Sequence, residues 1–160
     1  MKILGIETSC DETSIAVVEN GNTVLSSVVA SSIDWHKQYG GIVPEIATRY
    51  HVEVIAPLLK ESLIQSGLSS KDIDAVAVTQ GPGLIGSLIV GIAFAKSLSL
   101  ALKKPIIPID HILAHIYSAF MNSPDIKFPC LGLAVSGGHS SIFIINDFDN
   151  FRLIGKTRDD

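Results

Sequence analysis

The sequence predicts an α/β fold in which helices cover a mixed sheet. Two observations support this. Strand and helix patterns alternate through the middle of the chain, from a strand at Ala75–Thr79 to a helix at Leu84–Ala101, a strand at Ile106–Ile109 and a helix over 111–120. This order is typical of parallel strands joined by covering helices. The second observation is a run of three consecutive strands at the N-terminus, which indicates an antiparallel part of the same sheet.

The three N-terminal strands are predicted at Lys2–Thr8, Thr13–Glu19 and Thr23–Ala30, where β-branched and other apolar residues dominate. Asn20-Gly21-Asn22 between the second and third is a strong hairpin signal. The chain is therefore expected to open with a three-stranded meander, and residues Ser31–Gly41 are predicted to form a loop.

A long helix is predicted over 44–66. Its first residue is a proline, which is tolerated in the first turn, and Gly67 is a typical stop. Pro57 inside the helix is expected to kink it. Val52 and Ile64 lie outside the main apolar stripe, so the helix either is an ordinary core helix with stray apolar residues or pairs with a partner.

A second group of strands repeats the pattern of the first. Strands are predicted at Cys130–Ser136, Ser140–Ile145 and Phe151–Lys156, and Gly132 stands where Gly5 stands in the first group. The turn after each opening strand can offer backbone N–H groups to a phosphate. The duplication predicts two similar lobes facing a nucleotide, and the last strand stops without a closing element, as if the chain were cut mid-fold.

His111 and His115 are the candidate metal ligands. Residues four apart in a helix lie on one face, close enough to bind a single ion. Taken alone, such a pair is also compatible with histidines that only pack. His36 and His51 are single histidines, interpreted as surface or packing residues.

Composition limits the class of protein. The chain is 47% hydrophobic with a net charge of −4, which suits a packed domain and makes this part a poor nucleic-acid binder. The apolar run 84–102 is broken by Gly, Ser and Lys, so a buried helix is expected rather than a membrane span. No signal peptide is expected, and Cys10 and Cys130 are predicted to be free thiols in a reducing, cytoplasmic setting.

Five motifs occur together in order: Ile6–Thr13, Tyr39–Glu45, Gly81-Pro82-Gly83-Leu84, the His111/His115 pair and Val135–His139. They resemble the TsaD family, also called Gcp, and Kae in archaea and eukaryotes. These proteins are tRNA N6-adenosine threonylcarbamoyltransferases with the actin-like/Hsp70/sugar-kinase ATPase fold. The resemblance implies a first lobe over 1–127, which includes the HxxxH helix, and the opening strands of a truncated second lobe over 128–160.

The resemblance also implies a site. One metal ion, iron or alternatively zinc, would be bound by His111 and His115. The adenylate or nucleotide substrate would be lined by the following residues: Ala134, Val135, Ser136, Gly137, Gly138, Ser9 and Glu12. The implied reaction transfers a threonylcarbamoyl group from threonylcarbamoyl-adenylate to N6 of adenosine 37 in tRNAs that read codons starting with A.

Further implications concern completeness and partners. A third metal ligand, an aspartate, would lie beyond this chain, so residues 1–160 alone are expected to be inactive. Leu113 stands where family members often carry a glutamate. The implied partners are tRNA, TsaB and TsaE, with no membrane, and the helix over 44–66 is the candidate surface for TsaB or for a homodimer. No general base is identified.

The sequence leaves two alternative functions, a metallopeptidase and a non-catalytic actin-like subunit. A metallopeptidase of the HExxH type needs glutamate directly after the first histidine, and Ile112 occupies that position. The second alternative is a non-catalytic actin-like scaffold or nucleotide-binding subunit. The noncatalytic relative TsaB is similar in fold but lacks the histidine pair, so that pair favours the enzyme.

Overall fold

The computed structural model describes residues 1–121, 125–135 and 140–158. The chain divides into two compact units, Met1–His111 and Ile112–Asp160. The first contains a five-stranded sheet with two long helices, and the second contains a three-stranded sheet with most of helix α4 (His111–Met121).

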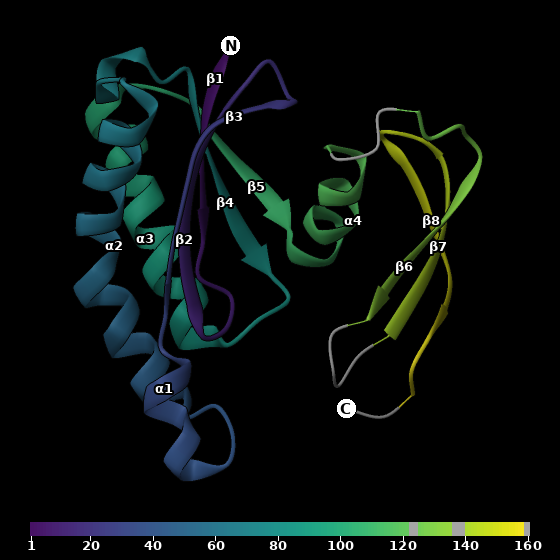
Figure 1. The fold of residues 1–160 in the computed structure, drawn as a ribbon, viewed down its shortest axis with the longest axis horizontal. Helices are drawn as coiled ribbons and strands as arrows, with labels where there is room; N and C mark the ends of the chain where they lie inside the picture. Colours follow the sequence, from purple (N-terminus) through teal and green to yellow (C-terminus); the bar gives the residue numbers. More distant parts are fainter. Residues whose placement is uncertain (122–124, 136–139, 159–160) are drawn as a thin grey trace. The chain divides into compact units, whose positions relative to one another are not determined.

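The first sheet is mixed, as predicted (Figure 1). Its strands are β1 (Lys2–Glu7), β2 (Glu12–Glu19), β3 (Thr23–Ser31), β4 (Ala75–Gly81) and β5 (Ile106–Asp110), in the order β3-β2-β1-β4-β5. β1, β2 and β3 form the expected antiparallel meander, whereas β4 pairs in parallel with β1 and with β5. The carboxyl ends of β1, β4 and β5 therefore meet at one edge, where α/β proteins commonly bind ligands.

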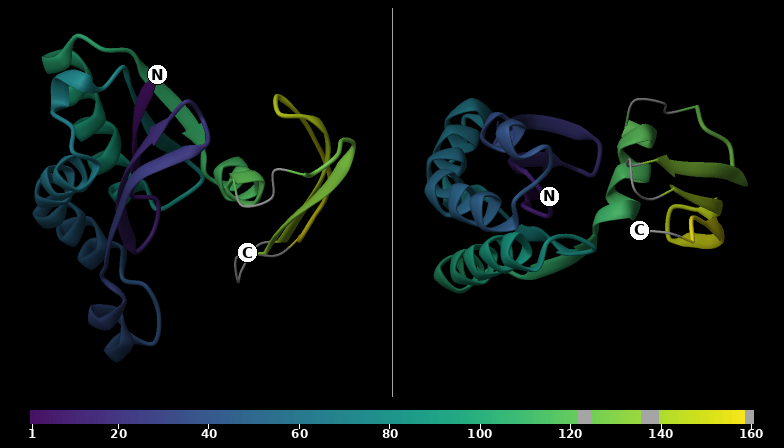
Figure 2. Two further views of the ribbon diagram at one scale, coloured as in Figure 1. Left: turned by 45° about the horizontal axis from the view of Figure 1, so that its top comes forward. Right: turned by 90° about the horizontal axis from the view of Figure 1, so that it is seen from below.

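Helices α2 (Pro44–Ser66) and α3 (Ile85–Leu102) lie side by side against one face of this sheet (Figure 2). Together they bury a core of aliphatic side chains, among them Leu4, Ile6, Ile15, Val17, Ile55, Leu58, Val76, Val78 and Ala95. α2 has the predicted bounds, continues through Pro57, and ends at Gly67, whose positive φ of 67° suits glycine.

Helix α3 is, among the described residues, the one helix long and apolar enough by composition to cross a bilayer. Its inner side nevertheless packs on the sheet: Ala95 is fully buried, and the Thr8 hydroxyl donates a hydrogen bond to the Ser87 carbonyl at 2.8 Å. Gly91 faces the Thr8 side chain at a separation that leaves no room for a Cβ. The prediction of a buried helix is therefore right for one side only: 17% of residues 85–102 are buried, and Ile85, Ile89 and Leu100 are exposed, because the helix contacts the sheet and α2 on its inner side alone.

The segment predicted as a loop contains two short helices, α1 (Ile33–His36) and η1 (Lys37–Tyr39). They are too short to produce a periodic sequence pattern. His36 anchors the segment: its buried ring donates through Nε2 to the Ser32 hydroxyl at 2.9 Å and accepts the Val43 N–H at Nδ1. A further short helix, η2 (Ser70–Asp72), has a capping box in which Ser69 and Asp72 bond each other's backbone N–H groups.

The second unit repeats the meander. Strands β6 (Cys130–Val135), β7 (Ser140–Asp147) and β8 (Asn150–Lys156) form an antiparallel sheet in that order. Gly132 pairs with Phe143 as Gly5 pairs with Ala16, so the duplication predicted from the sequence is confirmed for the described residues. Ring contacts join aromatic side chains of this unit, namely Tyr117, Phe120, Phe128, Phe148 and Phe151.

Candidate metal and substrate site

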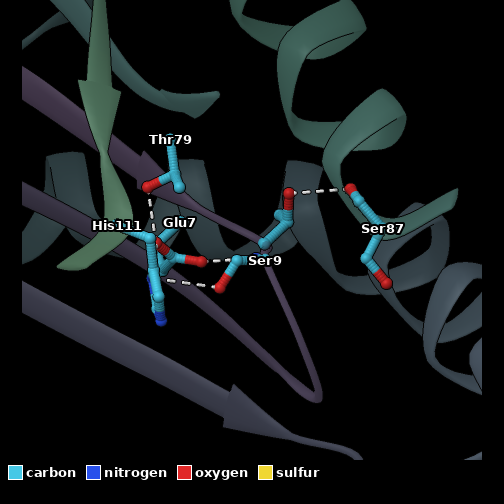
Figure 3. A network of polar contacts seen from close by, with 6 residues as sticks. Glu7, Ser9, Thr79, Ser87 and His111 are labelled. Carbon is cyan, nitrogen blue, oxygen red and sulfur yellow. Dashed lines mark hydrogen bonds and ion pairs between the residues drawn. The ribbon is translucent and has the colours of Figure 1, made fainter. Parts of the chain in front are cut away.

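Three polar side chains meet at the carboxyl edge of the first sheet (Figure 3). Glu7 is the last residue of β1, Thr79 lies near the end of β4, and His111 follows β5. The parallel register of β1, β4 and β5 brings these positions together although they are far apart in the sequence.

The Glu7 carboxylate is the centre of this cluster. Its Oε1 accepts the backbone N–H of Ser9, and its Oε2 accepts the Thr79 hydroxyl at 2.5 Å. The same Oε2 lies 3.2 Å from Nδ1 of His111, and the Ser9 Oγ lies 3.1 Å from that nitrogen. The carboxylate is thus bonded at once by the turn after β1, by β4 and by the first residue of α4.

Opposing effects set the charge of this cluster. Burial raises the pKa of Glu7, but hydrogen bonds from His111, Ser9 and Thr79 outweigh it and lower the pKa from 4.5 to about 2. The hydrogen bond to Glu7 raises the pKa of His111, against an opposing effect of burial. Glu7 is therefore ionised at neutral pH, so the cluster presents a carboxylate to the imidazole.

The turn between β1 and β2 is fixed by the Gly81-Pro82-Gly83-Leu84 segment. The Leu84 N–H donates to the Ser9 carbonyl at 2.7 Å, and a Cβ at Gly83 would lie 2.5 Å from that carbonyl oxygen. Only glycine allows this approach. The motif thus positions Ser9 beside Glu7 and His111.

Helix α2 supports the same turn through His51, which is fully buried. Its Nε2 donates to the Cys10 carbonyl at 3.1 Å, and its Nδ1 accepts the Thr13 hydroxyl at 2.7 Å. Burial lowers the pKa of His51, which favours the neutral ring these contacts require. His36 and His51 are thus packing residues, one of the two roles expected for them.

Cys10 in this turn is a half-buried free thiol. Burial and the neighbouring Asp11 raise its pKa, which keeps the sulfur protonated and weakens it as a nucleophile.

The predicted substrate residues of the first unit lie in different surroundings. Ser9 is 2% exposed and contacts His111, whereas Glu12 is exposed at the start of β2. In the second unit, His115, Ala134 and Val135 line one open, mainly apolar cavity of about 620 Å³. Of the remaining predicted residues, Ser136, Gly137 and Gly138 lie outside the described residues.

Metal-binding groups are sparse in the described part of the chain. His111 and His115 both belong to α4, at positions four apart. Across residues 1–121, 125–135 and 140–158, no cluster of three or more His, Cys, Asp or Glu side chains could hold a metal ion.

The sequence alone did not reveal the role of Glu7 or Thr79. The signal available was a polar residue at the end of each otherwise apolar strand. That signal identifies a sheet edge, but not the histidine that the two side chains meet.

Comparison with known proteins identifies the family. The sequence model of the family described as "TsaD: tRNA N6-adenosine threonylcarbamoyltransferase" matches residues 23–160. The chain belongs to the TsaD family. Curated TsaD proteins of this description from Kosmotoga olearia and Treponema denticola are 52% and 54% identical to it over 160 residues, which is all of this chain and 48% and 47% of theirs. The chain spans about half the length of these relatives.

Solved structures place this TsaD chain in the actin-like ATPase fold, as predicted. YeaZ from Pseudomonas aeruginosa superimposes with a TM-score of 0.63 at 16% identity, covering 98% of this chain and 68% of YeaZ. The ROK hexokinase from Thermus thermophilus gives 0.56 at 17% identity, covering 96% of this chain and 48% of the kinase. The Aquifex aeolicus Ppx/GppA phosphatase gives a TM-score of 0.54 at 10% identity, covering 98% of this chain and 51% of the phosphatase. At these identities the likeness concerns the fold.

Proposed function

We propose that the protein transfers a threonylcarbamoyl group from threonylcarbamoyl-adenylate to N6 of adenosine 37 in tRNAs that read codons starting with A. The observation that carries this proposal is the match over the whole chain, at 52–54% identity, to curated proteins described as tRNA N6-adenosine threonylcarbamoyltransferases. Because those proteins are about twice as long, we expect residues 1–160 alone to lack turnover.

We propose His111 and His115 as ligands of one metal ion, with iron as the first candidate and zinc as the second. The donor set fits such an ion in two respects: imidazole suits both metals, and His111 contacts a carboxylate, as metal-bound histidines commonly do. Further ligands would come from outside the described residues. A bound metal would supply Lewis-acid polarisation of a carbonyl or phosphoryl oxygen of the substrate.

The remaining residues are proposed to hold the adenylate. Ala134, Val135 and the segment 136–138 would line it from the second unit, with Ser9 and Glu12 contributing from the first. Small residues suit this role because backbone N–H groups can then approach a phosphate closely. His115, Ala134 and Val135 lining one cavity supports placing metal and substrate near each other.

The lobes and partners are proposed on family grounds. We propose a first lobe over 1–127 and the start of a second over 128–160, in a cytoplasmic enzyme that works with TsaB and TsaE. The net charge of −4 indicates that this part does not provide the main tRNA contact. Exposed apolar side chains on α2 suit a protein partner, either TsaB or a second copy: Val52 and Ile64.

The two alternative functions, metallopeptidase and non-catalytic subunit, have less support than the transferase. Ile112 still occupies the position of the glutamate that an HExxH peptidase needs. A non-catalytic actin-like subunit shares the fold but gives the histidine pair no role.

The proposal is tested by removing the gene from its host and measuring t6A in total tRNA by liquid chromatography and mass spectrometry. We expect the modified nucleoside to disappear and to return when the complete reading frame is supplied. His111→Ala and His115→Ala versions, expressed to the same level, should fail to restore it. Unchanged t6A after removal of the gene would exclude the proposed function, whereas full restoration by both variants would favour a non-metal role for the pair.

A further inference from the structure

We propose that Glu7 is a positioning residue for His111: it holds the imidazole proton on Nδ1 and so presents Nε2 as the metal-binding atom. This inference rests on the proposed metal site and adds to it a residue from another strand. It follows from the contacts at the sheet edge in Figure 3.

The first step concerns the proton. An ionised carboxylate only accepts hydrogen bonds, so the 3.2 Å contact between Glu7 Oε2 and His111 Nδ1 requires the proton to be on Nδ1. The Ser9 Oγ, 3.1 Å from the same nitrogen, can accept a share of that hydrogen bond. In the neutral ring the lone pair is then on Nε2, the atom through which a metal would be bound.

The second step concerns rigidity. A residue can orient another only if it is itself fixed. Oε1 accepts the Ser9 N–H and Oε2 accepts the Thr79 hydroxyl, so both carboxylate oxygens are engaged. Thr79 is buried, and the parallel pairing of Ile6 with Val78 sets the register that brings the two strand ends together. The orientation of the Glu7 carboxylate is therefore fixed by these hydrogen bonds and by the sheet register.

A comparison within the chain supports the assignment. The buried rings of His36 and His51 are bonded by hydroxyl and backbone groups, as is common for packing histidines. His111 has a carboxylate among its partners, the arrangement typical of histidines that bind metal ions. His111 is thus separated from the other two by the chemistry of its partner.

The first test measures metal affinity. Metal-free protein from the complete reading frame is titrated with Co²⁺, followed by its d–d absorption, for wild type, Glu7→Gln and the control Glu19→Gln. Glu19 lies at the opposite end of β2, where it pairs with Lys2. We expect Glu7→Gln to weaken Co²⁺ binding about 10- to 100-fold, and Glu19→Gln to leave it unchanged.

The second test reads the tautomer and does not depend on a variant folding. In metal-free wild type carrying ¹⁵N-labelled histidine, NMR should show the proton of His111 on Nδ1 in the neutral ring. In Glu7→Gln, whose amide can donate as well as accept, we expect a shift towards the Nε2–H form. A predominant Nε2–H form in wild type would overturn the proposal.

Two histidine variants separate failure of this inference from failure of the metal site. If His111→Ala abolishes Co²⁺ binding and Glu7→Gln binds as wild type does, Glu7 does not position His111 and the metal site stands. If His111→Ala and His115→Ala both bind as wild type does, the metal site and this inference are both wrong.

Discussion

At the scale of single residues, Glu7 connects parts of the chain that are distant in sequence. Its carboxylate is bonded by Ser9, Thr79 and His111, and the pKa of about 2 reflects those bonds acting against burial. A group whose pKa is lower in the folded than in the unfolded state stabilises the fold wherever it is ionised in both states. Glu7 should therefore contribute to stability as well as to orientation.

This contribution predicts a pH dependence. Stabilisation by Glu7 should be fully present above pH 4.5, its pKa without these contacts, and be lost as the pH falls towards 2. At 1.36 kcal/mol per pKa unit, it is worth about 3 kcal/mol at neutral pH. Urea unfolding of wild type and Glu7→Gln should show a gap of this order at pH 7 that narrows at pH 3. A gap that is constant from pH 7 to pH 3 would contradict the assignment.

Sequence reasoning found the histidine pair because a spacing of four is a local property of a helix. It did not find the Glu7 role because the two hydrogen bonds that define it span 72 and 104 residues. Those contacts depend on the order of strands in the sheet. Ser136–Gly138 were singled out as well, and their role stays a prediction.

At the scale of elements, the turn between β1 and β2 depends on the close approach of Gly83. Its position predicts that Gly83→Ala destabilises the protein by about 1–3 kcal/mol, because the added Cβ would meet the Ser9 backbone oxygen at 2.5 Å. Gly41→Ala is the control, since a Cβ there meets nothing within 4 Å. Thermal unfolding measures both. Equal melting temperatures for the two variants would show that Gly83 does not support this turn.

The outer surface of α2 is the subject of a second prediction at this scale. Val52 and Ile64 are 60% and 63% exposed, so lysine at both positions should change the free energy of unfolding by no more than about 0.5 kcal/mol. The Val52→Lys/Ile64→Lys double variant should also lose association with TsaB or with a second copy of the chain, as measured by size exclusion with light scattering. Val29→Lys on β3, also an exposed apolar position, is the control. An unchanged assembly state in the double variant would refute the proposed surface.

Element boundaries were predictable where local chemistry marks them. Pro44 and Gly67 delimit α2 because proline suits a first helical turn and glycine suits positive φ. The short helices α1 and η1 were not predictable from sequence, because segments of four and three residues do not show a helical period. Their position depends instead on the buried ring of His36.

At the scale of the whole molecule, duplication was the most informative pattern. Two antiparallel meanders, one in each unit, have glycines at corresponding positions, Gly5 and Gly132. This repeat could be recognised from sequence because strand patterns and glycine positions recur together. The meeting of Thr79 and His111 with Glu7 could not be recognised from sequence. It depends on the strand order of the sheet, which places β4 next to β1 and β5 next to β4.

The most direct test of the account is transfer of the threonylcarbamoyl group in vitro. Protein from the complete reading frame is combined with threonylcarbamoyl-adenylate, unmodified tRNA and the partner proteins, and t6A is measured over time. We predict t6A formation by wild type and by Glu19→Gln, and none above background by His111→Ala, His115→Ala or residues 1–160 alone. Wild-type rates in both histidine variants, or no transfer by wild type with all components present, would contradict the account.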